Sequence, residues 1–171
     1  MIQILGAQGD ICNVDFFLDK IQIFSKENNV IVQVFNADMV YGKKHLISSV
    51  QHAKRAFNRK TNTTNSLEME IILYASGERQ LKHAIPKMGV YTGKQNIAFA
   101  ILTKDNEDKI SDNLKEKLFE FLSLESNDKL LEGNIDTLKR FGIKNKEINT
   151  VNESKYQDLI LEKVAMVDII K

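Results

Sequence analysis

The chain has 171 residues, with one proline, 43% apolar residues and a formal net charge of +1 at pH 7. That composition excludes a disordered chain and predicts one domain, residues 1–171, with a sizeable core. The single cysteine, Cys12, excludes a disulfide framework and a cysteine-based zinc site. No stretch approaches the roughly 20 apolar residues that span a bilayer, and the first residues do not form an export signal. We therefore expect a cytoplasmic protein that does not enter a membrane.

Apolar patterns over the first 104 residues predict strands and helices in alternation. The expected strands are Ile2–Leu5, Val30–Phe35, Leu67–Ala75 and Asn96–Leu102. The third is interpreted as a strand because charged and apolar residues alternate at its start before it becomes fully apolar. The expected helices run from Asn13 or Asp15 to about Lys26, over the basic residues 43–60, and over Glu78–Ile85, ended around Pro86 and Gly89. A charged turn over 103–108 follows. This order predicts an α/β fold in which a central mixed β-sheet of about four strands is covered by helices.

The C-terminal part is patterned as helix throughout. Apolar spacing predicts one helix with Leu114, Leu118, Phe121 and Leu122, and another with Leu130, Leu131, Ile135 and Leu138 that ends at Gly142. The last helix is expected to begin at a capping box, Ser154 to Gln157, and to run to Ile170. Its apolar residues cover more than half of the helical wheel. Either this helix is central to the core or its far side binds another protein.

A long basic segment lies between Lys43 and Lys60. It holds six bases, and no acidic residue occurs between Asp38 and Glu68, although residues 105–171 are acidic on balance, with 15 acids and 11 bases. On a helical wheel the apolar side chains share one arc, and the opposite arc holds Lys44, Ser48, His52, Arg55 and Arg59. Six small polar residues, 61–66, follow as a loop. Such a ridge suits a polyanion, but a solvated helix face is the common alternative for a run of charge.

Arg79 and Gln80 form a second candidate cluster in the first turn of the next helix, where free amide groups favour phosphate. If residues 67–75 form a strand, it spans about 30 Å. Arg59 and Arg79 then cannot contact the same phosphate.

Catalytic motifs are missing from the sequence. His45 and His52 are seven residues apart on one helix, roughly 10 Å along its axis, too far to share a metal ion. We interpret both as surface or RNA-facing side chains. There is no P-loop, no dinucleotide fingerprint and no nucleophile elbow, and Glu68 and Glu70 fit the solvent face of a strand better than a carboxylate pair. These patterns predict a binding protein rather than an enzyme, with no cofactor and no metal.

The middle of the chain, roughly 40 to 103, resembles a known family. The residues that carry the resemblance are His45-Leu46, Ala53, Ala56, Asn62, the string from Glu70 to Leu81, Ala84-Ile85 and Gly89-Val90. This pattern is similar to the archaeal form of the small KEOPS-complex subunit that binds the complex's kinase, the TPRKB family. Length and element order agree over the rest of the chain.

The resemblance implies a non-catalytic role in making threonylcarbamoyl-adenosine beside the anticodon of tRNA. In that family the subunit docks on the N-lobe of a small atypical kinase/ATPase, promotes its activity and recruits tRNA through its 3′ CCA end. The RNA-binding residues we expect are Lys44, Arg55, Arg59, Lys60, Thr61, Asn62, Arg79 and Gln80. No aromatic residue lies between Asn58 and Ser66, so stacking on bases would need Phe57, Tyr74 or an aliphatic side chain.

The apolar surplus of the last helix, represented by Ile160, Val164 and Val167, is the expected docking surface for the kinase. A module that regulates a kinase without contacting RNA is the alternative function.

Overall fold

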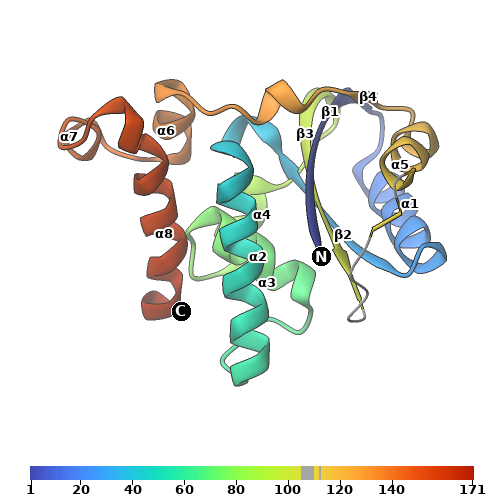
Figure 1. Ribbon diagram of the computed structural model, residues 1–171, viewed down its shortest axis with the longest axis horizontal. Coiled ribbons are helices and arrows are strands. Elements are labelled where there is room, and N and C mark those ends of the chain that lie inside the picture. The colour runs from blue at the N-terminus through green and yellow to red at the C-terminus, as the bar shows by residue number, and fades with distance from the viewer. Residues whose placement is uncertain (105–109, 112) are drawn as a thin grey trace.

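One antiparallel β-sheet forms the centre of the molecule. The computed structural model describes residues 1–104, 110, 111 and 113–171. In the described part, four strands pair in the order β2-β3-β1-β4 (Figure 1). Their bounds are Ile2–Ile11 for β1, Val30–Asn36 for β2, Gly93–Thr103 for β3 and Glu125–Ser126 for β4. The predicted α/β class is confirmed. The mixed sheet is wrong, because every pair is antiparallel and the long strand β3 runs between β1 and β2.

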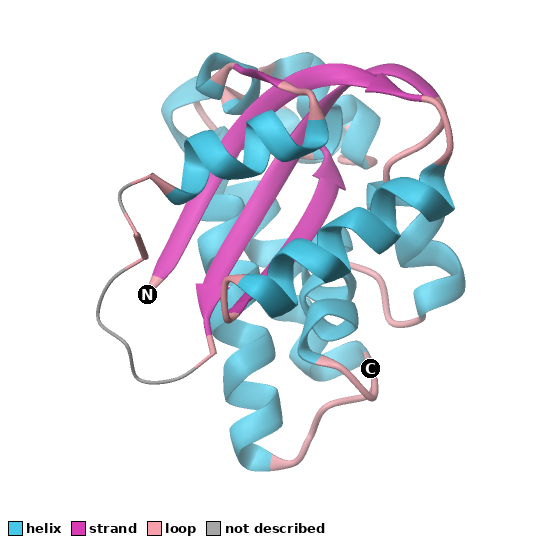
Figure 2. Cartoon of the chain, turned by 90° about the vertical axis from the view of Figure 1, so that its right-hand side faces the viewer, coloured by secondary structure: helices cyan, strands magenta, loops and turns pink. Residues whose placement is uncertain are grey.

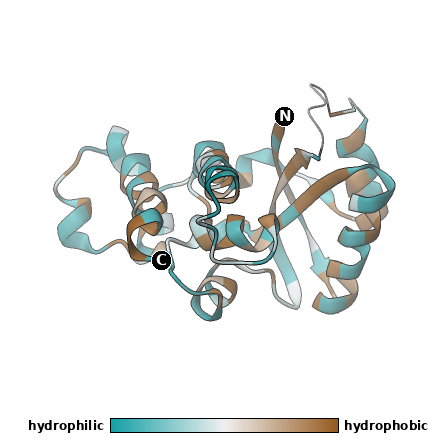
Figure 3. Ribbon diagram, turned by 90° about the horizontal axis from the view of Figure 1, so that it is seen from below, coloured by the Kyte–Doolittle hydropathy of each residue, from teal (hydrophilic) through white to brown (hydrophobic). Residues whose placement is uncertain are grey.

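Helices cover both faces of this sheet (Figure 2). Helices α1, Val14–Glu27, and α5, Leu114–Leu122, pack on one face with Leu5, Val32 and Phe99. The other face, with Phe35 and Ala98, packs against a larger helical layer. That layer comprises α2, Gly42–Arg59; α3, Leu67–Ser76; α4, Leu81–Met88; α6, Ile135–Phe141; α7, Asn145–Ile148; and α8, Tyr156–Ile170. Short 3₁₀ turns occur at Ala37–Met39, Asp128–Leu131 and Glu153–Lys155. Viewed from below, apolar colouring concentrates between these layers (Figure 3).

The predicted strand Leu67–Ala75 is wrong, since these residues form helix α3. Ser66 caps the helix, because its side chain accepts a hydrogen bond from the Met69 N–H at 3.2 Å, and Gly77 ends it in the left-handed conformation. All residues from Glu70 to Ser76 are buried. A helix that is buried on every side has no polar stripe, so its short apolar sequence is indistinguishable from that of a buried strand.

Most other boundaries agree with the sequence. The N-cap at Asn13, strand β2, the basic helix α2, helix α5 and the left-handed Gly142 after α6 are confirmed. Strands β1 and β3 are longer than expected. Helix α4 begins at Leu81 instead of Glu78, contains Pro86 and ends two residues after it, at Met88, before Gly89.

Two expectations for the later residues need correction, and a third is not tested. Residues 130–138 form a 3₁₀ turn and a separate helix. Helix α8 begins at Tyr156 without a side-chain cap, so the capping box at Ser154 is wrong. The charged turn falls largely on 105–109, which lie outside the described residues. No helix in the described ranges is long and apolar enough to cross a membrane.

His45 is a core residue, which corrects its interpretation as a surface side chain. It is 0% exposed, its Nε2 lies 2.8 Å from the Ala75 carbonyl oxygen, and its Nδ1 accepts from the Tyr41 N–H at 3.2 Å. Burial lowers the pKa of His45 to about 4, and the bond to Ala75 offsets only part of that effect. The neutral imidazole is therefore part of the fold.

This burial predicts a loss of stability in weak acid. The unfolded histidine titrates near pH 6.5, whereas the folded one stays neutral until about pH 4, so its contribution is complete above pH 6.5 and is lost as the pH falls towards 4. We expect the free energy of unfolding to drop by about 2 kcal/mol between pH 7 and pH 5 from this residue. Urea titrations at both pH values measure it. His45→Gln should be less stable at pH 7 but should lose that pH dependence; an unchanged slope would show that His45 does not cause it.

Candidate nucleic-acid interface

The end of α2 and the loop after it form an exposed cationic corner. Lys60 adopts the left-handed conformation, with φ of 57°, and its N–H bonds to the Phe57 carbonyl oxygen, which ends the helix. Arg59, Lys60 and Thr61 are all exposed. Within the described residues, neither Arg59 nor Lys60 has a carboxylate at ion-pair distance. Both positive charges therefore face solvent beside a polar loop.

A buried carboxylate, Glu70, holds the loop in place. The N–H groups of Thr63 and Thr64 donate to it at 3.1 and 2.9 Å, and the Thr64 hydroxyl lies 2.8 Å from the same oxygen. Lys171 contacts the other oxygen at 2.7 Å, and Glu70 is 0% exposed. The interpretation of Glu70 as solvent-facing is therefore wrong.

These contacts also set the charge of Glu70. Burial by itself raises the pKa of the carboxyl group. The hydrogen bonds from Lys171, Thr64 and Thr63 outweigh burial and hold that pKa below its usual value. The group is thus an anion at neutral pH, and it fixes the loop backbone so that Thr61, Thr63 and Asn65 are exposed.

Asp168, near the end of α8, anchors the same region from the outside. It accepts a hydrogen bond from the Tyr74 hydroxyl, lies 2.8 Å from His52 Nδ1 and lies 3.4 Å from Arg55 Nη2. Burial raises the pKa of Asp168, but the bonds from Tyr74 and His52 outweigh this and lower it below the usual value; burial and Asp168 in turn raise the pKa of Tyr74. Arg55 is therefore already paired with a carboxylate.

The predicted RNA contacts do not form one continuous surface. Lys44 is exposed, but it is 15 residues before Arg59 on the same helix, about 22 Å along its axis. Arg55 is paired as described. Arg79 and Gln80 are exposed just beyond the far end of α3, about 15 Å from the loop rather than 30 Å, because α3 is a helix. The structure brings together Arg59, Lys60, Thr61 and Asn62, and the Asn62 amide donates to the Thr64 carbonyl oxygen at 2.9 Å.

The residues chosen as a docking surface on the last helix are core residues. Ile160, Val164 and Val167 are each 0% exposed and pack in the larger cluster. As surface contacts they are therefore wrong, and the core interpretation holds. The apolar side chains that α8 does expose are those of Met166, 40% exposed, Ile169, 75% exposed, and Ile170, 39% exposed.

The sequence did not reveal the residues that organise this corner. Glu70 and Lys171 are 101 positions apart, and Tyr74 and Asp168 are 94 apart. A charged residue inside an otherwise apolar run, as at Glu70, was the one available signal of a buried anion with partners. No group of three or more histidine, cysteine or acidic residues within the described ranges is placed to hold a metal ion.

Comparison with known proteins identifies the family. The family model described as kinase binding protein CGI-121 matches residues 10–168. The chain belongs to the CGI-121 family. It is similar to a curated relative, "Regulatory protein Cgi121" of Methanocaldococcus jannaschii, at 32% identity over 141 residues, which cover 81% of this chain and 84% of the relative. The family-model match over residues 10–168 includes α2, α3, the loop between them and nearly all of α8. The resemblance to a kinase-binding subunit is thus confirmed at the level of the family.

The Glu70 contacts predict a large effect of one substitution. Glu70→Gln removes the charge that Lys171 and two N–H groups bond, so we expect the free energy of unfolding at pH 7 to fall by about 2–4 kcal/mol. Glu68→Gln, on the same helix but with no ion pair to any described residue, should change it by less than about 0.5 kcal/mol. Chemical denaturation of both variants measures this. Equal stabilities would show that the Glu70 network contributes little.

Proposed function

We propose that this CGI-121 protein is a non-catalytic subunit of a KEOPS complex that binds and activates the complex's small atypical kinase/ATPase. In the same proposal it recruits tRNA through the 3′ CCA end for threonylcarbamoyl-adenosine modification beside the anticodon. Support comes from family membership, from a relative named a regulatory protein, and from the sequence resemblance described above. A cytoplasmic location fits this role.

One observation favours RNA most strongly: two cations without a carboxylate partner in the described part of the chain lie directly before a polar loop whose backbone is already fixed. Arg59 and Lys60 would contact phosphates, while Thr61 and the free carbonyl oxygen of Asn62 would hydrogen-bond base edges of an unpaired strand. Because Glu70 already orders the loop, little conformational entropy would be lost on binding. In the absence of an aromatic residue in the loop, the Arg59 guanidinium is the candidate for stacking on a base.

The remaining predicted contacts take secondary roles in this proposal. Lys44, Arg79 and Gln80 lie too far away for the terminal nucleotides and would contact other parts of the tRNA backbone. Arg55, held by Asp168, contributes less than a free arginine because its charge is compensated. The ion pair between Arg55 and Asp168 and the one between Lys43 and Asp128, at 2.9 Å, favour the alternative function, which is a kinase regulator without RNA contacts.

The exposed end of α8 is the proposed kinase-docking surface. Met166, Ile169 and Ile170 lie in the last turns of the helix, outside the face that packs on α2 and α3. Apolar side chains that are exposed together near the end of a helix are typical of a protein interface. Asp168 and Lys171, between and beside them, contact α2 and Glu70, the carboxylate that holds the loop, so the two proposed surfaces adjoin.

Charge reversal tests the RNA surface. The double variant Arg59→Glu/Lys60→Glu should weaken tRNA binding at least tenfold and lower the slope of log affinity against log salt by about two, one for each lost phosphate contact. A gel-shift titration at several salt concentrations measures both. The matched control is Lys139→Glu/Lys146→Glu, which changes the net charge equally on exposed residues of α6 and α7.

The outcome separates the two functions. If both double variants weaken binding equally, net charge alone drives association and the corner is not the site. Removing CCA from the tRNA should cost the wild-type protein affinity and should cost the Arg59/Lys60 variant little.

A second substitution tests kinase docking. Ile169→Asp should abolish association with the kinase by pull-down while leaving thermal unfolding unchanged, because the side chain is mostly exposed. Ile23→Asp, at an exposed position of α1, is the control and should leave association intact. Normal kinase binding by Ile169→Asp would remove this surface from the proposal.

A further inference from the structure

Strand β2 has one free edge, which no other strand of the described sheet covers. It pairs only with β3, and the sheet order places it at the border. An edge strand presents unpaired N–H and C=O groups, which are a template for another strand.

Hydrogen bonds elsewhere in the sheet show which residues of β2 present these unpaired groups. The Thr103 N–H bonds to the Met1 carbonyl oxygen, so the main-chain groups of Thr103 and of every second residue before it face β1. The main-chain groups of the residues between these, including Leu102 and Ala100, face β2. Since Ile31 lies opposite Leu102 and Gln33 opposite Ala100, these two residues bond to β3.

The groups of Val30, Val32 and Val34 therefore point to the free edge. One contact agrees with this assignment: the Gln33 side-chain amide donates to the Val34 carbonyl oxygen at 3.0 Å. The outward groups of Val32 have no hydrogen-bond partner among the described residues, and Val32 lines a groove. An unpaired peptide group there is available to a ligand or to water.

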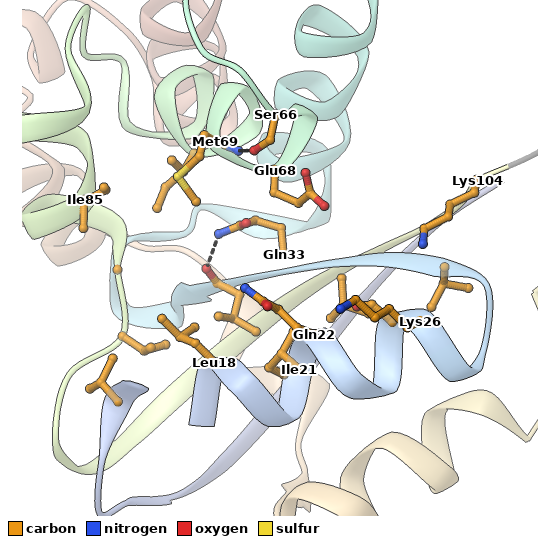
Figure 4. Close-up of a pocket in the computed structure, with 18 residues that line it drawn as sticks. Leu18, Ile21, Gln22, Lys26, Gln33, Ser66, Glu68, Met69, Ile85 and Lys104 are labelled. Carbon is orange, nitrogen blue, oxygen red and sulfur yellow. Dashed lines mark hydrogen bonds between the residues drawn. The ribbon is translucent and has the colours of Figure 1, made fainter. Parts of the chain in front are cut away.

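This edge lies along a groove with apolar walls (Figure 4). A cavity of about 510 Å³ lies between α1 on one side and the start of α3 with α4 on the other. The α1 wall presents Leu18 and Ile21, and the opposite wall presents Met69, Ile72 and Ile85. An added strand directs alternate side chains to opposite sides, so both sets would meet apolar surface.

Charge is unequal along the groove. Lys26 and Lys104 lie towards the end where β2 begins at Val30, and Glu68 lies on the α3 wall (Figure 4). Among the described residues that line the groove, the charged ones are these two cations and this one anion. An acidic residue in the occupant would be attracted there.

We propose that this groove binds an extended peptide segment of another protein as an added β-strand. The segment pairs with the main chain of Val32 and Val34, places apolar side chains against α1 and α3, and carries an acidic residue beside Lys26 and Lys104. Main-chain bonds provide affinity and the two walls provide specificity. None of the lining residues belongs to the surfaces proposed above for RNA and kinase, so this site is independent of both.

The test uses a displayed library of random nine-residue peptides, selected on the wild-type protein and counter-selected on Leu18→Lys/Ile85→Lys. Both substituted side chains are already exposed, at 37% and 46%, so the fold should persist; thermal unfolding checks this. The control is Ile23→Lys on α1, exposed at 48% and outside the groove. Selected peptides should share an apolar, β-branched run with an acid at one end, should bind the control normally and should bind the double variant at least tenfold more weakly.

Hydrogen exchange distinguishes strand addition from apolar contact alone. A selected synthetic peptide should slow exchange of the Val32 and Val34 amides at least tenfold, and N-methylation of the peptide amides on the paired side should abolish binding. The proposal is overturned if no peptide depends on the groove. It is equally overturned if peptides bind while the exchange of these two amides is unchanged, which would indicate a simple apolar pocket.

Discussion

This structure depends most on the contacts that the buried carboxylate of Glu70 makes. It lies inside α3, where an isolated charge would be strongly unfavourable, and it is stabilised by the N–H groups of Thr63 and Thr64 and by Lys171. Through one anion, the loop after α2, the first turn of α3 and the end of α8 are held together. The conformation of the candidate RNA loop is therefore a property of the core and not of the loop sequence alone.

Helix α8 connects the acidic C-terminal part of the chain with the basic helix α2. Asp168 contacts the basic helix α2, Lys171 contacts Glu70 of α3, and Asp128 pairs with Lys43 near the start of α2. Among the described residues, the acidic C-terminal part thus neutralises some of the basic ridge and leaves Arg59 and Lys60 without a carboxylate partner. Selective neutralisation concentrates the positive potential at one corner, beside the exposed end of the helix that we assign to kinase docking.

Sequence patterns predicted the elements whose two faces differ. The wheel of α2 placed Leu46, Val50 and Ala53 correctly in the core, since a single polar stripe determines the phase of a helix. Helix α3 was missed because it is buried all round, and α8 was predicted only in part, since periodicity cannot show which apolar residues pack inward. The contact of Glu70 with Lys171 and that of Asp168 with Tyr74 could not be predicted, because the partners lie 101 and 94 positions apart.

We propose that a loop ordered by Glu70, beside Arg59 and Lys60, receives the unpaired end of a tRNA. A map of backbone amide shifts by NMR, recorded as a short hairpin ending in CCA is added, tests this proposal. The largest changes should occur over residues 59–65 and should disappear when the hairpin lacks CCA. Changes confined to other surfaces, with the amides of 59–65 unaffected, would refute the proposal.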